Sequence, residues 1–143
     1  MKLQHHIAYS LAVSAAAYAV SRSKTMAAVS FLSGVFIDLD HIPDYVREHG
    51  LRCDAHFFFH SFTKTLYRKV VIPLHAWEIV VFLAIGGIVS HGNHAILGML
   101  IGFAFHLAAD QITNGVCAGG YFITYRMAKG FVTRRIFPGK GIE

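Results

Sequence analysis

Charged residues are scarce in this chain of 143 amino acids. Asp, Glu, Lys and Arg make up only 15% of the sequence, hydrophobic residues make up 55%, and the mean hydropathy is +0.48. A globular domain in water commonly carries about 25% charged residues. The composition therefore argues against an ordinary soluble surface and favours a protein that is embedded in a membrane or associated with one.

Cysteine is also scarce, and its spacing forms no motif. The two cysteines, Cys53 and Cys117, lie far apart, and neither belongs to a C-x-x-C pair. This pattern excludes a disulfide framework, and we interpret both as free thiols in a reducing compartment. A chain of this length predicts a single domain, residues 1–143, which can bury a core without disulfide bonds.

Internal repeats, low-complexity segments and recognisable nucleic-acid-binding motifs are absent as well. The net charge of +5 can indicate nucleic acid, anionic lipid or membrane topology. Without a helix-turn-helix or a stacked-aromatic signature, no specific nucleic-acid ligand is expected. A soluble basic protein that binds nucleic acid is therefore an alternative that no motif supports.

Four apolar segments have the length and the Ala and Leu content of helices, namely residues 3–20, 25–39, 73–90 and 95–109. Each is shorter than the roughly 20 residues of a typical spanning helix. We therefore predict an all-α, membrane-associated bundle of about four short helices, with a buried soluble bundle as the alternative. The C-terminal tail predicts either a β-hairpin around residues 128–130 or a basic amphipathic surface element.

Basic residues are distributed unevenly between the connections. If the four helices span a membrane, one side contains all of the 13 lysines and arginines except Arg22 and Lys24. Cytoplasmic loops are enriched in such residues, so we predict that both termini are cytoplasmic. The first segment follows a single lysine and opens on His5 and His6, which favours an uncleaved helix over a signal peptide.

In the same four-span arrangement, polar side chains at the ends of the apolar segments fall on that side. They are His5 and His6, then Asp38, Asp40 and His41, then His75 and Glu78, and finally His106 and Asp110. A carboxylate at membrane depth costs about 3 kcal/mol unless it is paired, solvated or metal-bound. Each residue alone has a simpler role, such as a core histidine, and we interpret Asp44 as a turn residue after Pro43. A metal site accounts for all four groups together, and carboxylates with imidazoles suit Zn²⁺, Mn²⁺ or Fe²⁺.

The order of these motifs resembles the YdjM-like family of bacterial inner-membrane-associated proteins, which are classed by prediction as metal-dependent hydrolases. The matching residues are His6, then Asp38, Asp40 and His41 in D-L-D-H, His60 and Ser61 in H-S, and His106 and Asp110 in H-L-A-A-D, followed by Thr113 and Gly115. The chain departs from the family at Ile37, where proline is usual, and after His56, where no arginine follows.

The resemblance implies a metal-dependent hydrolase of the bacterial inner (plasma) membrane. It implies metal ligands at His6, Asp38, Asp40, His41, His60, His106 and Asp110. Asp40 would be a ligand, a partner that orients a histidine, or the catalytic general base. One or two divalent ions are expected, Zn²⁺ before Mn²⁺ or Fe²⁺.

The expected substrate is an anionic phosphoester such as a lipid head group, because the site would lie near the membrane surface. Arg52, Lys64 and Arg68 would attract it. The alternative function is a non-enzymatic membrane protein with a structural metal site or a partner-docking role. A structural site would have its coordination filled by protein ligands.

Overall fold

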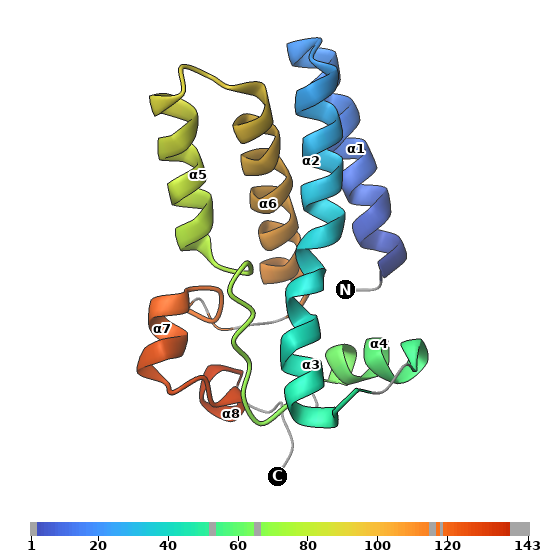
Figure 1. Cartoon of the computed structure of the whole chain (residues 1–143), viewed down its shortest axis with the longest axis vertical. Helices are drawn as coiled ribbons and strands as arrows, with labels where there is room; N and C mark the ends of the chain where they lie inside the picture. Colours follow the sequence, from blue (N-terminus) through green and yellow to red (C-terminus); the bar gives the residue numbers. More distant parts are fainter. Residues whose placement is uncertain (1–2, 52–53, 65–66, 115–116, 118, 138–143) are drawn as a thin grey trace.

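The computed structural model describes residues 3–51, 54–64, 67–114, 117 and 119–137. Four long helices, α1 (Leu3–Ser21), α2 (Lys24–Phe36), α5 (Trp77–Val89) and α6 (His94–Thr113), form an up-and-down bundle (Figure 1). They correspond to the four predicted segments, so the all-α prediction is confirmed. The β structure of the described residues is limited to one isolated bridge between Lys69 and Val132.

The second helix is longer than predicted. Its first turn is capped by Ser23, whose hydroxyl accepts a hydrogen bond from Met26 N at 3.2 Å. It then passes through a 3₁₀ turn, η1 (Ile37–Asp40), into α3 (His41–His49), which ends at Gly50 with a φ of 72°. Pro43 does not interrupt the helix because it lies in the first turn of α3, where its missing N–H costs least.

Small residues bring α2 and α6 into close contact. A Cβ atom added to Gly98 would lie 2.5 Å from the Met26 carbonyl oxygen, and one added to Gly102 would lie 2.5 Å from the Ser30 carbonyl oxygen. Gly98 and Gly102 form a G-x-x-x-G pair, a motif that lets two helix backbones approach in apolar surroundings. The packing of α2 on α6 therefore depends on the absence of side chains at these two positions.

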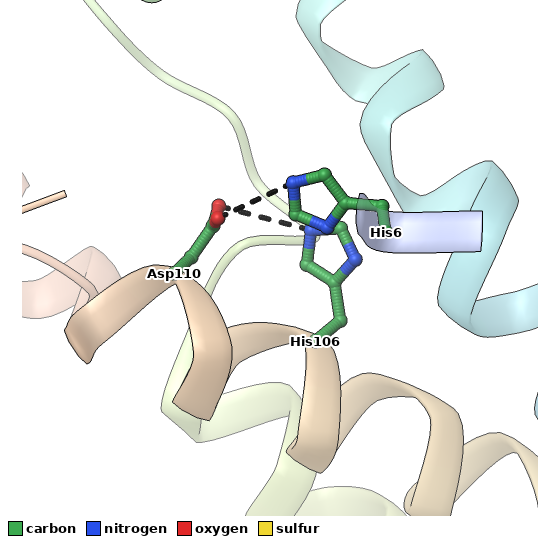
Figure 2. Close-up of side chains that lie close together, drawn as sticks. All are labelled: His6, His106 and Asp110. Carbon is green, nitrogen blue, oxygen red and sulfur yellow. Dashed lines mark ion pairs between the residues drawn. The ribbon is translucent and has the colours of Figure 1, made fainter. Parts of the chain in front are cut away.

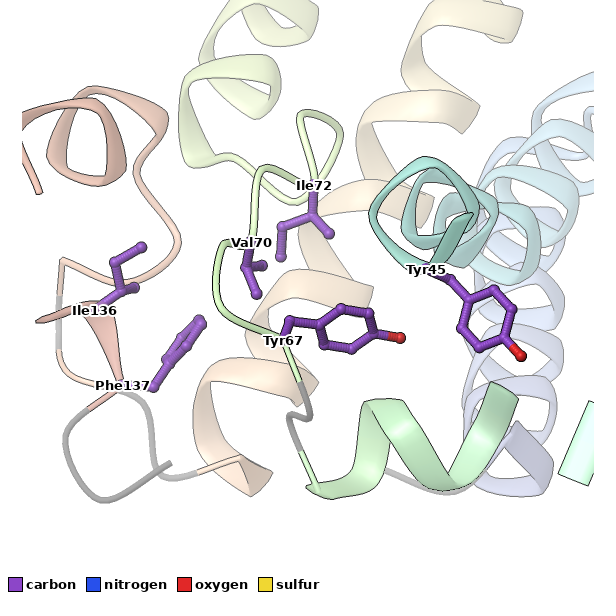
Figure 3. Packing of buried hydrophobic residues seen from close by; sticks show 6 residues of the cluster. All are labelled: Tyr45, Tyr67, Val70, Ile72, Ile136 and Phe137. Atoms are coloured by element: carbon purple, nitrogen blue, oxygen red, sulfur yellow. The ribbon is translucent and has the colours of Figure 1, made fainter. Parts of the chain in front are cut away.

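One end of the bundle carries a cap of shorter elements (Figure 1). The cap contains α3, α4 (Ala55–Lys64), the segment 67–76, α7 (Ile123–Ala128) and α8 (Thr133–Ile136). Its own apolar core consists of Tyr45, Tyr67, Val70, Ile72, Ile136 and Phe137 (Figure 3). Backbone hydrogen bonds from Val70 N to Phe131 O and from Thr133 N to Arg68 O join the segment 67–76 to the tail.

The tail does not contain the predicted β-hairpin in its described part. Instead α7 and α8 are connected by a turn in which Gly130 has a φ of 65°. The reason is tertiary: Glu78 of α5 accepts hydrogen bonds from Ile123 N and Thr124 N, both at 3.0 Å. These two N–H groups lack partners within α7, so the Glu78 carboxylate stabilises its first turn.

The basic residues are sorted as predicted. Those described at the cap are Arg47, Arg68, Lys69, Arg126, Lys129, Arg134 and Arg135, whereas Arg22 and Lys24 lie where α1 joins α2, at the opposite end of the bundle (Figure 1). Two continuous helices, Lys24–His49 and His94–Thr113, are long and apolar enough to cross a membrane.

Candidate metal centre

Four imidazole rings form a row where the bundle meets the cap. The rings of His6 and His106 are stacked with centroids 4.3 Å apart, His106 and His75 are 5.2 Å apart, and His75 and His41 are 4.7 Å apart. They come from α1, α6, the segment before α5, and the junction of η1 with α3. Residues separated by up to 100 positions in the sequence therefore converge on one site.

Two carboxylates lie against this row. Asp38 Oδ1 is 3.2 Å from His75 Nε2, 3.4 Å from His106 Nε2 and 3.8 Å from His41 Nε2. Asp110 faces the other half of the row: its Oδ1 is 3.5 Å from His6 Nε2, and its Oδ2 is 3.7 Å from His106 Nε2 (Figure 2). Zinc ligands at about 2.0–2.1 Å in a tetrahedron are about 3.3 Å apart. The observed separations are thus close to those between ligands of one ion.

The two central histidines are oriented with Nε2 toward the carboxylates. His75 Nδ1 donates to Asp40 Oδ1 at 3.0 Å, and His106 Nδ1 donates to the carbonyl oxygen of Gly34 at 2.8 Å. Both Nε2 atoms are buried, and each faces Asp38 Oδ1, at 3.2 Å for His75 and 3.4 Å for His106. Metal-bound histidines commonly donate their second ring N–H to such a partner, which fixes the tautomer that coordinates the metal.

His75 reaches the site because two carboxylates accept hydrogen bonds from the backbone of the segment that precedes it. Asp40 Oδ2 accepts from Leu74 N at 2.7 Å, and Asp44 Oδ2 accepts from Val71 N at 2.7 Å. Asp44 also pairs with Arg47 at 2.8 Å, so its predicted role as a simple turn residue is wrong. The guanidinium of Arg126 also holds this segment, because it donates to the His75 carbonyl oxygen at 3.0 Å.

The electrostatics of His75 fit a site for a cation. Burial lowers the pKa of this imidazole, but the carboxylates of Asp38 and Asp40 outweigh burial and raise its pKa to about 10. The two carboxylates therefore stabilise a positive charge on this ring. A bound metal ion would take the place of the proton, because histidine coordinates as the neutral ring.

The two halves of the site differ in their exposure to solvent. The side chains of His6 and Asp110 are 6% and 8% exposed, whereas those of Asp38 and His41 are 31% and 20% exposed. The half of the site formed by α1 and α6 is thus closed. The half formed by η1 and α3 is accessible, so an exchangeable ligand or a substrate would approach from there.

Five of the predicted ligands meet at this site: His6, Asp38, His41, His106 and Asp110. Asp40 lies behind His75, and both of its oxygens accept hydrogen bonds, as expected for the orienting role among the three that we predicted. His60 lies on α4 and is exposed, and it is not part of the described cluster. Glu78 is engaged by α7 instead.

His75 is the residue that the motif-based ligand set omitted. Its position just before an apolar helix, at the end where the other polar groups gather, indicated in the sequence that His75 could belong to the site. None of the motifs on which the family resemblance rests includes His75, and the segment 67–76 has no helical periodicity from which its direction could be inferred. Comparisons with family models, with curated proteins and with solved structures give no match to this chain, so the geometry of the site is what indicates its function.

Proposed function

We propose that the protein is a membrane-bound, metal-dependent hydrolase that acts on phosphoesters, with its site facing the cytoplasm. One observation carries the proposal: two buried imidazoles have their Nδ1 atoms fixed by hydrogen bonds and their Nε2 atoms directed at two carboxylates. Zinc suits this set of nitrogen and oxygen donors, with Mn²⁺ or Fe²⁺ as alternatives. The resemblance to the YdjM-like family is consistent with this function and stays a prediction.

The accessible half of the site favours catalysis over a purely structural metal. A structural zinc site is closed by four protein ligands, whereas a catalytic one keeps a position for water or substrate. The partial exposure of Asp38 and His41 supports such an open position. A metal ion there would lower the pKa of its bound water to about 7 and so supply a hydroxide nucleophile near neutral pH.

The chain's own residues would orient the ligands. Asp40 holds the His75 ring, and the Gly34 carbonyl oxygen holds the His106 ring. Of the three basic residues predicted to attract an anionic substrate, Arg68 has a described side chain. It is exposed and lies 3.6 Å from Glu48. Basic groups at the cap would nevertheless favour an anionic substrate over a neutral one.

Apolar residues on the outside of the bundle support the membrane location. Large exposed side chains line its helices: Ile7, Tyr9, Leu11, Tyr18, Val20, Leu32, Phe36, Val81, Phe82, Ile85, Ile88, Val89, Met99, Phe105 and Ile112. Soluble monomers rarely expose contiguous apolar patches of more than a few hundred Å². A lipid environment would cover these side chains and place the site near the head groups on the cytoplasmic side.

The metal and the reaction can be tested on the purified protein. We expect elemental analysis to find at least one divalent ion per chain after incubation with Zn²⁺ and removal of excess metal. We further expect hydrolysis of at least one member of a phosphoester panel to be lost after chelation and restored by metal. Protein that binds no Zn²⁺, Mn²⁺ or Fe²⁺ would contradict the proposal, and metal-loaded protein inactive on the whole panel would leave only the structural alternative.

The membrane location predicts how the protein fractionates. We expect it to remain in the membrane pellet after washes with high salt and with alkaline carbonate, and to enter solution only with detergent. The apolar side chains on the bundle cause this behaviour, because salt removes proteins held by charge alone. Full recovery in salt without detergent would contradict the membrane assignment and would leave the metal site untouched.

A further inference from the structure

The six ligand-type side chains of the site fall into two groups of three. His6, His106 and Asp110 form the first group, and Asp38, His41 and His75 form the second. Within each group, the candidate ligand atoms all lie within 4.8 Å of one another. The two groups share no residue, and each combines two imidazoles with one carboxylate, a donor set that can hold a divalent ion.

A single ion cannot use all of these ligands. His6 and His41 stand at opposite ends of the row of rings, separated by the rings of His106 and His75. Ligand atoms bound to one ion at about 2.0–2.2 Å lie at most about 4.4 Å apart, whereas His6 and His41 belong to different groups, within each of which the ligand atoms lie within 4.8 Å of one another. If the site held one ion, at least one of His6 and His41 would bind no metal.

The two carboxylates link the groups. Asp38 belongs to the second group, yet its Oδ1 lies 3.4 Å from His106 Nε2 of the first. Asp110 belongs to the first group, yet its Oδ2 lies 3.9 Å from His75 Nε2 of the second, while its Oδ1 faces His6. Carboxylates placed between two sets of ligands in this way are suited to bridge two ions.

We propose that the site holds two divalent cations, one bound by His6, His106 and Asp110 and the other by Asp38, His41 and His75, with the two carboxylates as bridges. This inference rests on the proposed metal-dependent function and adds the number of ions and the ligands of each. Two ions about 3.5–4 Å apart stabilise both the attacking and the leaving oxygen of an in-line displacement at phosphorus. The accessible second ion contacts the substrate, and the first ion is enclosed by the bundle.

Charge complementarity supports the same substrate class. Two divalent ions bring four positive charges, whereas Asp38, Asp110 and the nearby Asp40 bring three negative charges. The loaded site is thus short of negative charge even with all three carboxylates ionised. The deficit is one charge, which a hydroxide or an oxygen of an anionic phosphoester would supply, whereas a neutral ester or amide brings no negative charge.

Metal stoichiometry tests the inference independently of activity. Metal-free protein in detergent is titrated with Mn²⁺, and bound metal is measured by elemental analysis after removal of the free ion. We expect two ions per chain in the wild type, one in His6→Gln and one in His41→Gln. The matched control His60→Gln, which changes an exposed histidine outside the cluster, should keep two.

Electron paramagnetic resonance of the same Mn²⁺-loaded proteins gives a second readout. Two bridged Mn²⁺ ions are expected to show a spin-coupled spectrum at full loading, and each single variant should show the uncoupled spectrum of an isolated ion. Saturation of the wild type at one ion with an uncoupled spectrum would overturn the two-ion inference and leave the metal-dependent function standing. Saturation at zero would remove both.

Discussion

Replacing His75 with alanine is expected to lower the affinity for the divalent ion bound with Asp38 and His41 by more than about 100-fold and to abolish hydrolysis. Loss of an outer partner of a metal ligand typically costs 10–100-fold, and His75 is itself placed as a ligand. Its Nε2 lies within 3.9 Å of both carboxylates, Asp38 and Asp110. The measurement is competition with a chromophoric zinc chelator, with circular dichroism to verify that the variant is folded.

Two further variants make this result specific. His60→Ala changes an exposed histidine and should keep the wild-type affinity, although the family resemblance places a ligand there. Asp40→Asn keeps the His75 ring but places an amide group beside the backbone N–H groups of Leu74 and His75, so a smaller loss of about 10–100-fold is expected. If His60→Ala lost the metal and His75→Ala kept it, the ligand set assigned from the geometry would be refuted.

Replacing Gly102 with alanine is expected to destabilise the protein by about 1–3 kcal/mol, the usual cost of overpacking a core. The new Cβ would lie 2.5 Å from the Ser30 carbonyl oxygen and 2.9 Å from Gly34 N. Both are backbone atoms of α2, so the clash is relieved only if the two helices move apart. Thermal unfolding in detergent, followed by circular dichroism, measures the change.

Gly86→Ala is the matched control for this substitution. A Cβ atom there would meet only Ile96 Cγ2 at 3.6 Å, an ordinary van der Waals contact. Alanine is favoured over glycine in a helix by about 1 kcal/mol, so Gly86→Ala should leave the unfolding temperature unchanged or raise it. Equal losses of stability in the two variants would show that close packing of α2 on α6 does not control the stability of the bundle.

Gly102→Ala should also weaken metal binding. His106 lies one helical turn after Gly102, and its Nδ1 reaches the Gly34 carbonyl oxygen of α2 at 2.8 Å. Separation of the helices would lengthen this hydrogen bond and release the orientation of the ring. We therefore expect Gly102→Ala to lower metal affinity even at temperatures where it is fully folded, whereas Gly86→Ala should not.

Much of the bundle and part of the site follow from the sequence alone. Apolar segments of 15 to 18 residues with polar ends must form helices that bury one face, and alternating helix directions bring every second end to the same side of the bundle. For this reason the convergence of His6, Asp38, His41, His106 and Asp110 could be predicted without knowing how the helices pack. The helix that packs against Gly98 and Gly102, by contrast, is defined only by the fold.

The tertiary structure alone decided the remaining features. His75 enters the site through a segment without regular structure, whose course depends on hydrogen bonds from Leu74 N to Asp40 and from Val71 N to Asp44, residues 34 and 27 positions away. The helical tail likewise depends on Glu78, 45 positions before Ile123. Helical periodicity records only which neighbours share a face. Contacts of this range carry no periodic signal, so the orienting role of Asp40 and the place of His75 emerge only when the chain is folded.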